Sequence, residues 1–130
     1  MAAVEPKIRV DRVSKEFAQN GRPIRVLDEV NLHAGDGEFV SIIGPSGCGK
    51  STLLNIIAGL QEPTDGSIYI DGRLARRRLG QVGFMQQKDL LLPWRSVLDN
   101  AILGLGLRGV GKRAARSRAM ESIELFGLKG

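Results

Sequence analysis

The chain has 130 residues, of which 42% are hydrophobic and 25% are charged, and its formal net charge is +5 at pH 7. This composition is ordinary for one globular domain with a single core. The single cysteine excludes an internal disulfide framework, and no apolar stretch approaches the length needed to cross a bilayer.

The first 43 residues are expected to form an antiparallel β layer that leads into a buried strand. Residues 7–14 alternate apolar and charged side chains, which is typical of a strand with one solvated face. A turn signal at residues 19–23 precedes strand-like apolar residues between 24 and 32. Residues 38–43, Glu-Phe-Val-Ser-Ile-Ile, then read as a short buried strand.

The segment that follows is the most informative part of the chain. It reads Gly-Pro-Ser-Gly-Cys-Gly-Lys-Ser and fits the phosphate-binding pattern G-x-x-x-x-G-K-[ST] without a mismatch. The pattern requires a strand before the loop and a helix after it, and the apolar residues 52–59 indicate that helix. A glycine-rich turn that matches by chance is the alternative, and these flanks argue against it. The candidate binding residues are Gly44, Pro45, Ser46, Gly47, Cys48, Gly49, Lys50, Ser51 and Thr52.

This loop has the chemistry that a nucleoside triphosphate requires. Glycines let the backbone turn tightly with its N–H groups facing the phosphates, and the helix N-terminus adds a partial positive charge. Lys50 is expected to reach the β- and γ-phosphates, and the Ser51 hydroxyl is expected to bind Mg²⁺. Thr52 can donate to a neighbouring oxygen. Cys48 is interpreted as a small side chain at a tolerant loop position rather than as a metal ligand.

Short elements are expected after the loop and its helix. A turn rich in Pro and Gly at residues 61–66 leads to a short strand over residues 67–70. A basic connector over residues 73–78 then precedes another short, buried strand over residues 82–85.

Two helices are expected near the end of the chain. Ser96 and Asp99 form an N-terminal capping pattern for a helix over residues 97–107. A second helix over residues 112–126 carries one apolar face, and Gly127 fits its C-cap.

The excess positive charge is concentrated in two clusters, which we interpret as solvated or membrane-proximal faces. Aromatic residues make up only 5% of the chain and do not alternate with the arginines, so base stacking is poorly supported and no nucleic-acid partner is expected. The clusters are Arg73, Arg76, Arg77 and Arg78, and Lys112, Arg113, Arg116 and Arg118.

Together these features resemble the ATP-binding subunits of ABC transporters over essentially the whole chain. Residues 13–17 are similar to the N-terminal strand of that family, residues 44–52 to its phosphate loop, and residues 59–72 to its strand-and-turn ladder. The resemblance implies an incomplete α/β fold. It would contain a P-loop NTPase core, an N-terminal antiparallel β layer and the start of a helical insertion. Residues 1–130 would be the N-terminal part of one ATP-binding domain. Its β layer and core would span residues 1–88, and the Q-loop region and helical start residues 89–130.

The resemblance assigns two further residues to the nucleotide, and it implies ATP and Mg²⁺ as cofactors. Phe17 looks like the aromatic residue that stacks on adenine. Gln87 looks like the Q-loop glutamine, which senses the γ-phosphate and helps to hold Mg²⁺. Gln86 is the alternative, and the spacing to the family's Leu-Leu-Pro-Trp, here residues 91–94, favours Gln87.

Residues 91–100 resemble one group of importers more narrowly, those for nitrate, sulfonates, taurine and related small anions. The resemblance implies a transmembrane permease subunit as partner, with Trp94 in the docking groove. It also implies a second ATP-binding subunit in a homodimer, an indirect connection to a solute-binding protein, and a cytoplasmic location on the inner face of the membrane.

The family's catalytic residues are missing from this sequence. It contains no Leu-Ser-Gly-Gly-Gln segment and no later apolar strand that ends in Asp-Glu. The chain as given is therefore expected to bind ATP, to be inactive as an ATPase alone, and to be marginally stable. We interpret it as the N-terminal part of an importer ATPase. A non-catalytic nucleotide-binding fragment from a truncated reading frame is the alternative, and another class of P-loop protein is disfavoured.

Overall fold

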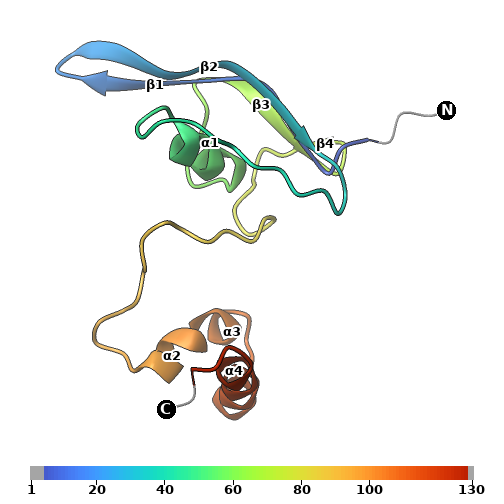
Figure 1. Cartoon of the computed structure of the whole chain (residues 1–130), viewed down its shortest axis with the longest axis vertical. Coiled ribbons are helices and arrows are strands. Elements are labelled where there is room, and N and C mark those ends of the chain that lie inside the picture. The colour runs from blue at the N-terminus through green and yellow to red at the C-terminus, as the bar shows by residue number, and fades with distance from the viewer. Residues whose placement is uncertain (1–4, 129–130) are drawn as a thin grey trace. The chain divides into compact units, whose positions relative to one another are not determined.

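The computed structural model describes residues 5–128, which form two compact units that meet between Phe84 and Met85 (Figure 1). The first unit holds the strands and one helix, and the second holds three helices. The sequence places the corresponding boundary after residue 88. Within the described residues, no helix is both long and apolar enough to span a membrane.

An antiparallel sheet dominates the first unit, as the alternating sequence pattern predicts. Its strands are β1 (Ile8–Gln19), β2 (Arg22–Ala34), β3 (Asp65–Ile70) and β4 (Arg73–Leu74), in the order β2-β1-β3-β4. The two runs expected between residues 24 and 32 form one continuous strand. Asn20 and Gly21 make the turn with φ angles of 51° and 74°, which matches the predicted turn signal.

The core of the first unit lies between this sheet and α1 (Lys50–Ile57). Leu53, Ile56 and Ile57 have the spacing of one helix face, and each is buried. Full burial of one such side chain contributes about 1.5–3 kcal/mol. After the helix, Gly59 at φ 78° lets the N–H of Leu60 reach the carbonyl of Asn55 at 2.9 Å. The core side chains are Val10, Val13, Leu27, Leu53, Ile56, Ile57 and Ile68.

An irregularity in β1 brings its backbone close to β3. Arg12 has a φ of 46°, and the β1–β3 register shifts between Asp11 and Ser14. Gly66, at φ 86°, lies against this bend, and a Cβ atom there would collide with the carbonyl group of Arg12. Glycine is therefore required at this position both for its backbone conformation and for the close approach of two strands.

Replacing Gly66 with alanine is expected to lower the free energy of unfolding by about 2–3 kcal/mol, because strain at positive φ adds to a clash with backbone atoms. Gly21→Ala is the matched control. Gly21 also has a positive φ, of 74°, but an added Cβ would meet nothing within 4 Å. Urea denaturation followed by circular dichroism measures both variants. Equal losses of unfolding free energy in the two variants would show that the clash with the Arg12 backbone does not contribute.

Two predicted strands are wrong. Residues 38–43 and 82–85 form no strand, and the side chains of Phe39 and Ile43 are 93% and 91% exposed. A strand exists through hydrogen bonds to its neighbours, and a parallel strand is normally covered on both faces. Among the described residues no strand pairs with either segment. Only Ile42 from the first segment packs against the core.

The second unit contains α2 (Val97–Ala101), α3 (Leu103–Leu107) and α4 (Lys112–Leu125). The single helix expected over residues 97–107 is divided at Ile102, just before two glycines weaken the helical tendency. The Ser96 hydroxyl accepts from the N–H of Asp99 at 3.1 Å, which confirms the predicted cap. Gly127, at φ 67°, ends α4 as predicted. Ile102, Ala115 and Ala119 form the small core of this unit.

Candidate nucleotide-binding site

The glycine-rich loop enters α1 from a backbone conformation that only glycine adopts readily. Gly47 and Gly49 have φ angles of 80° and 96°, and Gly49 is the residue at the N-cap of α1. A Cβ atom on Gly49 would lie 2.9 Å from the Val26 carbonyl oxygen and 2.8 Å from Leu27 Cδ2. Gly49 therefore lets the start of α1 pack directly against β2.

The first turn of α1 presents backbone donors at the loop. The first helical hydrogen bond runs from the N–H of Leu53 to the Gly49 carbonyl, at 2.9 Å. The N–H groups of Lys50, Ser51 and Thr52 therefore precede the first helical bond, and they carry the positive end of the helix dipole. The side chain of Ser51 is exposed beside them. A phosphate group is the natural ligand of such an end.

Lys50 turns its ammonium group back into the loop. Its Nζ donates to the carbonyl oxygens of Gly44 at 2.8 Å and Pro45 at 2.6 Å, and it lies 3.5 Å from Cys48 Sγ. The loop thus wraps around a positive charge. A Cβ atom on Gly44 would come within 2.9 Å of Cys48 Sγ, so a larger residue would close this turn. The structure therefore brings residues 44–52 together in one arrangement.

These features fit a bound phosphate chain with its magnesium ion. The fit rests on the positive φ angles of Gly47 and Gly49, the donors at the start of α1, and the Lys50 ammonium group. Among the described residues, no group of three or more His, Cys, Asp or Glu side chains could hold a metal ion. Mg²⁺ commonly binds through few protein ligands together with phosphate oxygens and water, which suits the exposed Ser51 hydroxyl.

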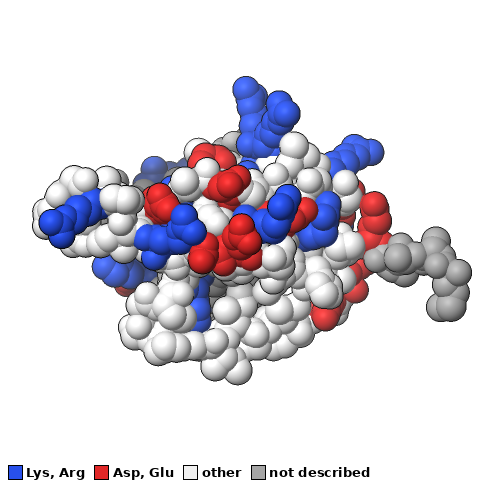
Figure 2. All heavy atoms as spheres, turned by 90° about the horizontal axis from the view of Figure 1, so that it is seen from above, with Lys and Arg blue, Asp and Glu red and all other residues white. Residues whose placement is uncertain are grey.

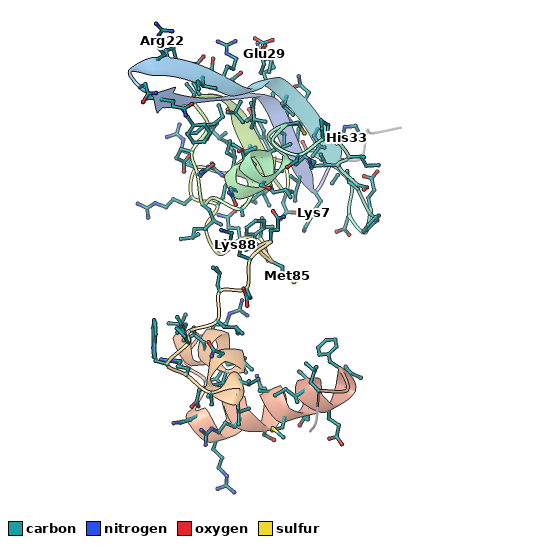
Figure 3. The ribbon with its side chains drawn as sticks, turned by 60° about the vertical axis from the view of Figure 1, so that its left-hand side comes forward. Lys7, Arg22, Glu29, His33, Met85 and Lys88 are labelled. Atoms are coloured by element: carbon teal, nitrogen blue, oxygen red, sulfur yellow. The ribbon has the colours of Figure 1, made fainter. Side chains whose placement is uncertain are left out.

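The other two predicted binding residues lie in different units. Phe17 is in β1, in the unit that contains the phosphate loop, and its ring is 38% exposed with Lys15 Nζ 5.2 Å from the centroid. Gln87 is an exposed residue in the loop that begins the second unit. The structure therefore does not test whether Gln87 approaches the phosphate loop, and both roles stay predictions. His33, the only histidine, is exposed on β2 (Figure 3).

Arg78 is a structural residue that the sequence interpretation missed. Its side chain is 4% exposed rather than part of a solvated basic face. It donates to the carbonyls of Ile56 and Ala75, both at 2.9 Å, and to that of Gln61 at 3.3 Å, and it pairs with Glu62 at 2.7 Å. The guanidinium therefore ties the end of α1 to the connector. No local signal distinguishes Arg78 from its arginine neighbours, because its partners lie elsewhere in the chain.

Asn100 is the second residue that sequence reasoning missed. Its Oδ1 accepts from the N–H of Leu92 at 2.8 Å, and its Nδ2 donates to the carbonyl of Leu92 at 3.2 Å and that of Ser96 at 3.0 Å. These bonds hold the Leu-Leu-Pro-Trp turn against α2, while the Trp94 side chain is 77% exposed. An apolar side chain is thus presented to solvent on a braced turn.

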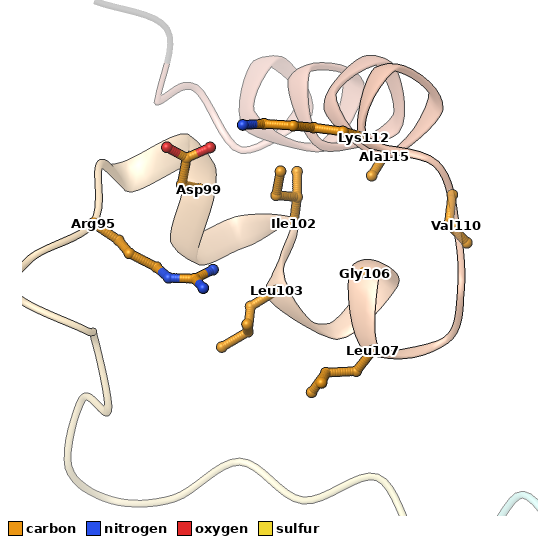
Figure 4. Close-up of a pocket in the computed structure, with 9 residues that line it drawn as sticks. All are labelled: Arg95, Asp99, Ile102, Leu103, Gly106, Leu107, Val110, Lys112 and Ala115. Carbon is orange, nitrogen blue, oxygen red and sulfur yellow. The ribbon is translucent and has the colours of Figure 1, made fainter.

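A cavity of about 470 Å³ lies within the second unit (Figure 4). Ile102, Leu103 and Val110 contribute apolar lining, with the charged groups of Arg95 and Lys112 beside them. Asp99 also lines it and pairs with Arg116 at 3.0 Å; this bond and the Ser96 hydroxyl lower the pKa of the Asp99 carboxyl. Because Asp99 is in α2 and Arg116 is in α4, this ion pair supports the packing of the two helices.

The fold and the loop define a nucleotide-binding unit of the P-loop class. A family model described as ABC transporter matches residues 27–130, and the chain belongs to that family.

Several relatives of the chain are named as import ATP-binding proteins. It is 42% identical over 123 residues to the taurine import ATP-binding protein TauB of Pseudomonas aeruginosa, covering 95% of this chain and 47% of that protein. It is 46% identical over 122 residues to TauB of Rhizobium johnstonii, covering 93% and 47%. The chain thus spans about half the length of the curated relatives it matches.

Solved structures confirm the expected fold class. The dimeric structure of MJ0796, a bacterial ABC transporter cassette, matches with a TM-score of 0.80 and 36% identity, covering 90% of this chain and 56% of that one. A post-hydrolysis state of MJ0796 bound to ADP and phosphate matches with a TM-score of 0.79 and 36% identity over the same shares of the two chains. The antiparallel sheet, the loop and the helices are thus parts of an ABC cassette.

Proposed function

We propose that this chain provides the ATP-binding core of an ABC importer subunit. The observation that carries the proposal is the Lys50 ammonium group inside a glycine loop at the start of α1. Its two carbonyl contacts, at 2.8 Å and 2.6 Å, hold the charge where a phosphate would bind. Phosphate oxygens would replace the two carbonyl oxygens as acceptors, and these bonds would be stronger because both donor and acceptor would carry charge.

Different residues would bind different parts of the nucleotide. The backbone donors of residues 47–52 would surround the phosphates, and Lys50 would neutralise charge on the β- and γ-phosphates. Ser51 would hold Mg²⁺ with the help of Gln87, and the ion would supply positive charge against the phosphates when bound. The partly exposed Phe17 ring, with Lys15 beside it, would stack on the purine base.

Hydrolysis and transport would belong to the whole protein. The family resemblance implies that a signature segment and a catalytic acid complete the site between two ATP-binding subunits, and the dimeric MJ0796 structures support such a pair. Exposed apolar side chains on the Asn100-braced turn, those of Leu90, Leu91 and Trp94, support a contact with a permease subunit on the cytoplasmic side of the membrane. A solute-binding protein would act through that permease.

A small sulfonate of the taurine type is the solute that we propose. The support is the identity of 38–46% to taurine import proteins from several bacteria, together with the Leu-Leu-Pro-Trp turn. Nitrate and other sulfonates are the neighbouring possibilities within the same group of importers. No residue of this chain is proposed to contact the solute.

Deleting the gene in its native host is expected to abolish uptake of radiolabelled taurine and to leave uptake of an unrelated sugar unchanged. Complementation with the complete gene should restore uptake, whereas the same gene carrying Lys50→Ala should not, because ATP binding is strongly weakened and the cation at the β- and γ-phosphates is lost. Loss of nitrate uptake with intact taurine uptake would keep the importer assignment and replace the solute. Unchanged uptake of all these anions would overturn the proposal.

A further inference from the structure

A second concentration of positive charge surrounds a cavity in the first unit. The cavity has a volume of about 620 Å³ and lies beside β4 and the connector after it. Three arginines line it, Arg73, Arg76 and Arg77, together with Gln81. None of the residues of the phosphate loop contributes to it.

The three arginine side chains have no anionic partner within the described part of the chain. The side chains of Arg73, Arg76 and Arg77 make neither an ion pair nor a hydrogen bond among those residues. Asp71 is the only carboxylate that lines the cavity, and it pairs with Lys7 at 2.6 Å. That hydrogen bond and the charge of Asp71 raise the pKa of Lys7. The cavity therefore keeps three guanidinium groups that form no ion pair with a described residue, although the Glu5 carboxylate lies beside Gly72 next to Arg73.

The outer face of the sheet provides a contrast. Arg9 pairs there with Asp11 at 3.0 Å, and Arg25 pairs with Glu16 at 2.9 Å and with Asp28 at 2.7 Å. In Figure 2 blue and red side chains alternate over this part of the surface. Ion pairing thus accounts for Arg9 and Arg25 of the sheet, but it does not account for the three arginines of the cavity.

Hydrogen bonds hold the connector that presents these arginines. The buried Arg78 donates to the carbonyl of Ala75 at 2.9 Å, and the N–H of Ala75 donates to the β3 carbonyl of Ile68 at 2.9 Å. Gln81 closes the loop, because its Nε2 donates to the carbonyl of Arg77 at 2.6 Å and its N–H to that of Arg78 at 2.9 Å. Arg76 and Arg77 therefore project from a fixed backbone, which lowers the entropic cost of gathering them around a ligand.

We propose that this arginine cavity binds the phosphate group of a small, soluble phosphorylated molecule. A guanidinium group presents a planar fork of donors that matches phosphate geometry, and a phosphate has enough acceptor oxygens for more than one arginine. The cavity volume lies in the range of sites for small organic ligands of about 300–1,000 Å³. A second anion site of this kind would let the cassette sense a phosphorylated metabolite apart from the nucleotide in its phosphate loop.

Pyrophosphate titrated into the chain by calorimetry tests the site. The experiment uses the Lys50→Ala background, in which phosphate binding at the loop is weakened, so that the arginine cavity contributes a larger share of the signal. Replacing Arg73, Arg76 and Arg77 together with glutamine should weaken pyrophosphate binding by about tenfold or more, because the charge-assisted bonds are lost. The matched control replaces Arg108, Arg113 and Arg118 with glutamine. It removes the same charge from exposed positions in the second unit and should leave the affinity within about twofold.

Replacement of the three cavity arginines with lysine separates geometry from charge. Lysine keeps the charge but loses the fork, so an intermediate loss of affinity is expected. The proposal would be overturned if the lysine variant bound pyrophosphate as tightly as the chain with its arginines. It would also be overturned if the control variant lost as much affinity as the glutamine variant, or if pyrophosphate did not bind the Lys50→Ala chain at all. Vesicles containing phosphatidic acid provide the last arm. If they compete with pyrophosphate through the cavity arginines, the ligand is a lipid headgroup and the assignment to a soluble molecule is overturned; no competition is the expected result.

Discussion

Replacing Lys50 with alanine is expected to weaken ATP binding by about a hundredfold, which corresponds to about 3 kcal/mol. The ammonium group lies inside the loop on two carbonyl oxygens, so the variant loses the one side-chain cation that the loop contains. Titration with a fluorescent ATP analogue in the presence of Mg²⁺ measures the change. The remaining backbone donors at the start of α1 should still bind phosphate weakly.

Lys112→Ala is the control for this experiment. It removes one lysine of equal charge from the exposed start of α4, in the second unit, and should leave ATP affinity within about twofold, because Lys112 is not part of the phosphate loop and salt screens exposed charges. Circular dichroism of both variants checks that the fold is kept. Equal affinity of the Lys50→Ala variant and the unmodified chain would contradict the assignment of the phosphate loop.

Replacing Arg78 with methionine is expected to lower the free energy of unfolding by about 3–4 kcal/mol. Methionine fills much of the same space but donates no hydrogen bond, so the carbonyls of Ala75 and Gln61 would lose their donor. The Glu62 carboxylate is 71% exposed, so the loss of the ion pair adds little. Urea denaturation followed by far-ultraviolet circular dichroism measures the effect.

Arg77→Met provides the comparison, because Arg77 is the adjacent residue and its side chain is exposed without a partner among the described residues. A change within about 0.5 kcal/mol is expected for it. Arg78→Lys should fall between the two, since an ammonium group cannot reach all the acceptors of the guanidinium. Similar losses for the Arg77 and Arg78 variants would mean that the buried hydrogen bonds do not stabilise the connector.

The sequence interpretation was accurate for features that depend on neighbouring residues, and it failed for features that depend on residues distant in the sequence. The hairpin turn at Asn20 and Gly21, the Ser96 cap and the Gly127 stop were all predicted correctly, since each depends on residues within a few positions. Residues 38–43 were predicted as a strand from their apolar side chains alone. That prediction failed because a strand also needs neighbours, and the described residues supply none.

Arg78 is a second case in which contacts with distant residues decide the outcome. The sequence does not distinguish it from the three other arginines of its cluster, all of which were interpreted as solvated. The fold places it beside the end of α1, where it is buried and donates to the Ile56 carbonyl. Asn100 and Gly66 are similar cases. Their importance comes from the carbonyl and N–H of Leu92 and from the bend at Arg12, which are brought to them by the fold.

The amino-acid sequence by itself determined the phosphate loop, its donors and the family, because a tight turn of glycines followed by a lysine is a local arrangement encoded in consecutive residues. The tertiary structure decided which basic residues are structural and which remain available for an anion. Burial and hydrogen bonding are set by segments distant in the sequence, and they separate Arg78 from Arg73, Arg76 and Arg77.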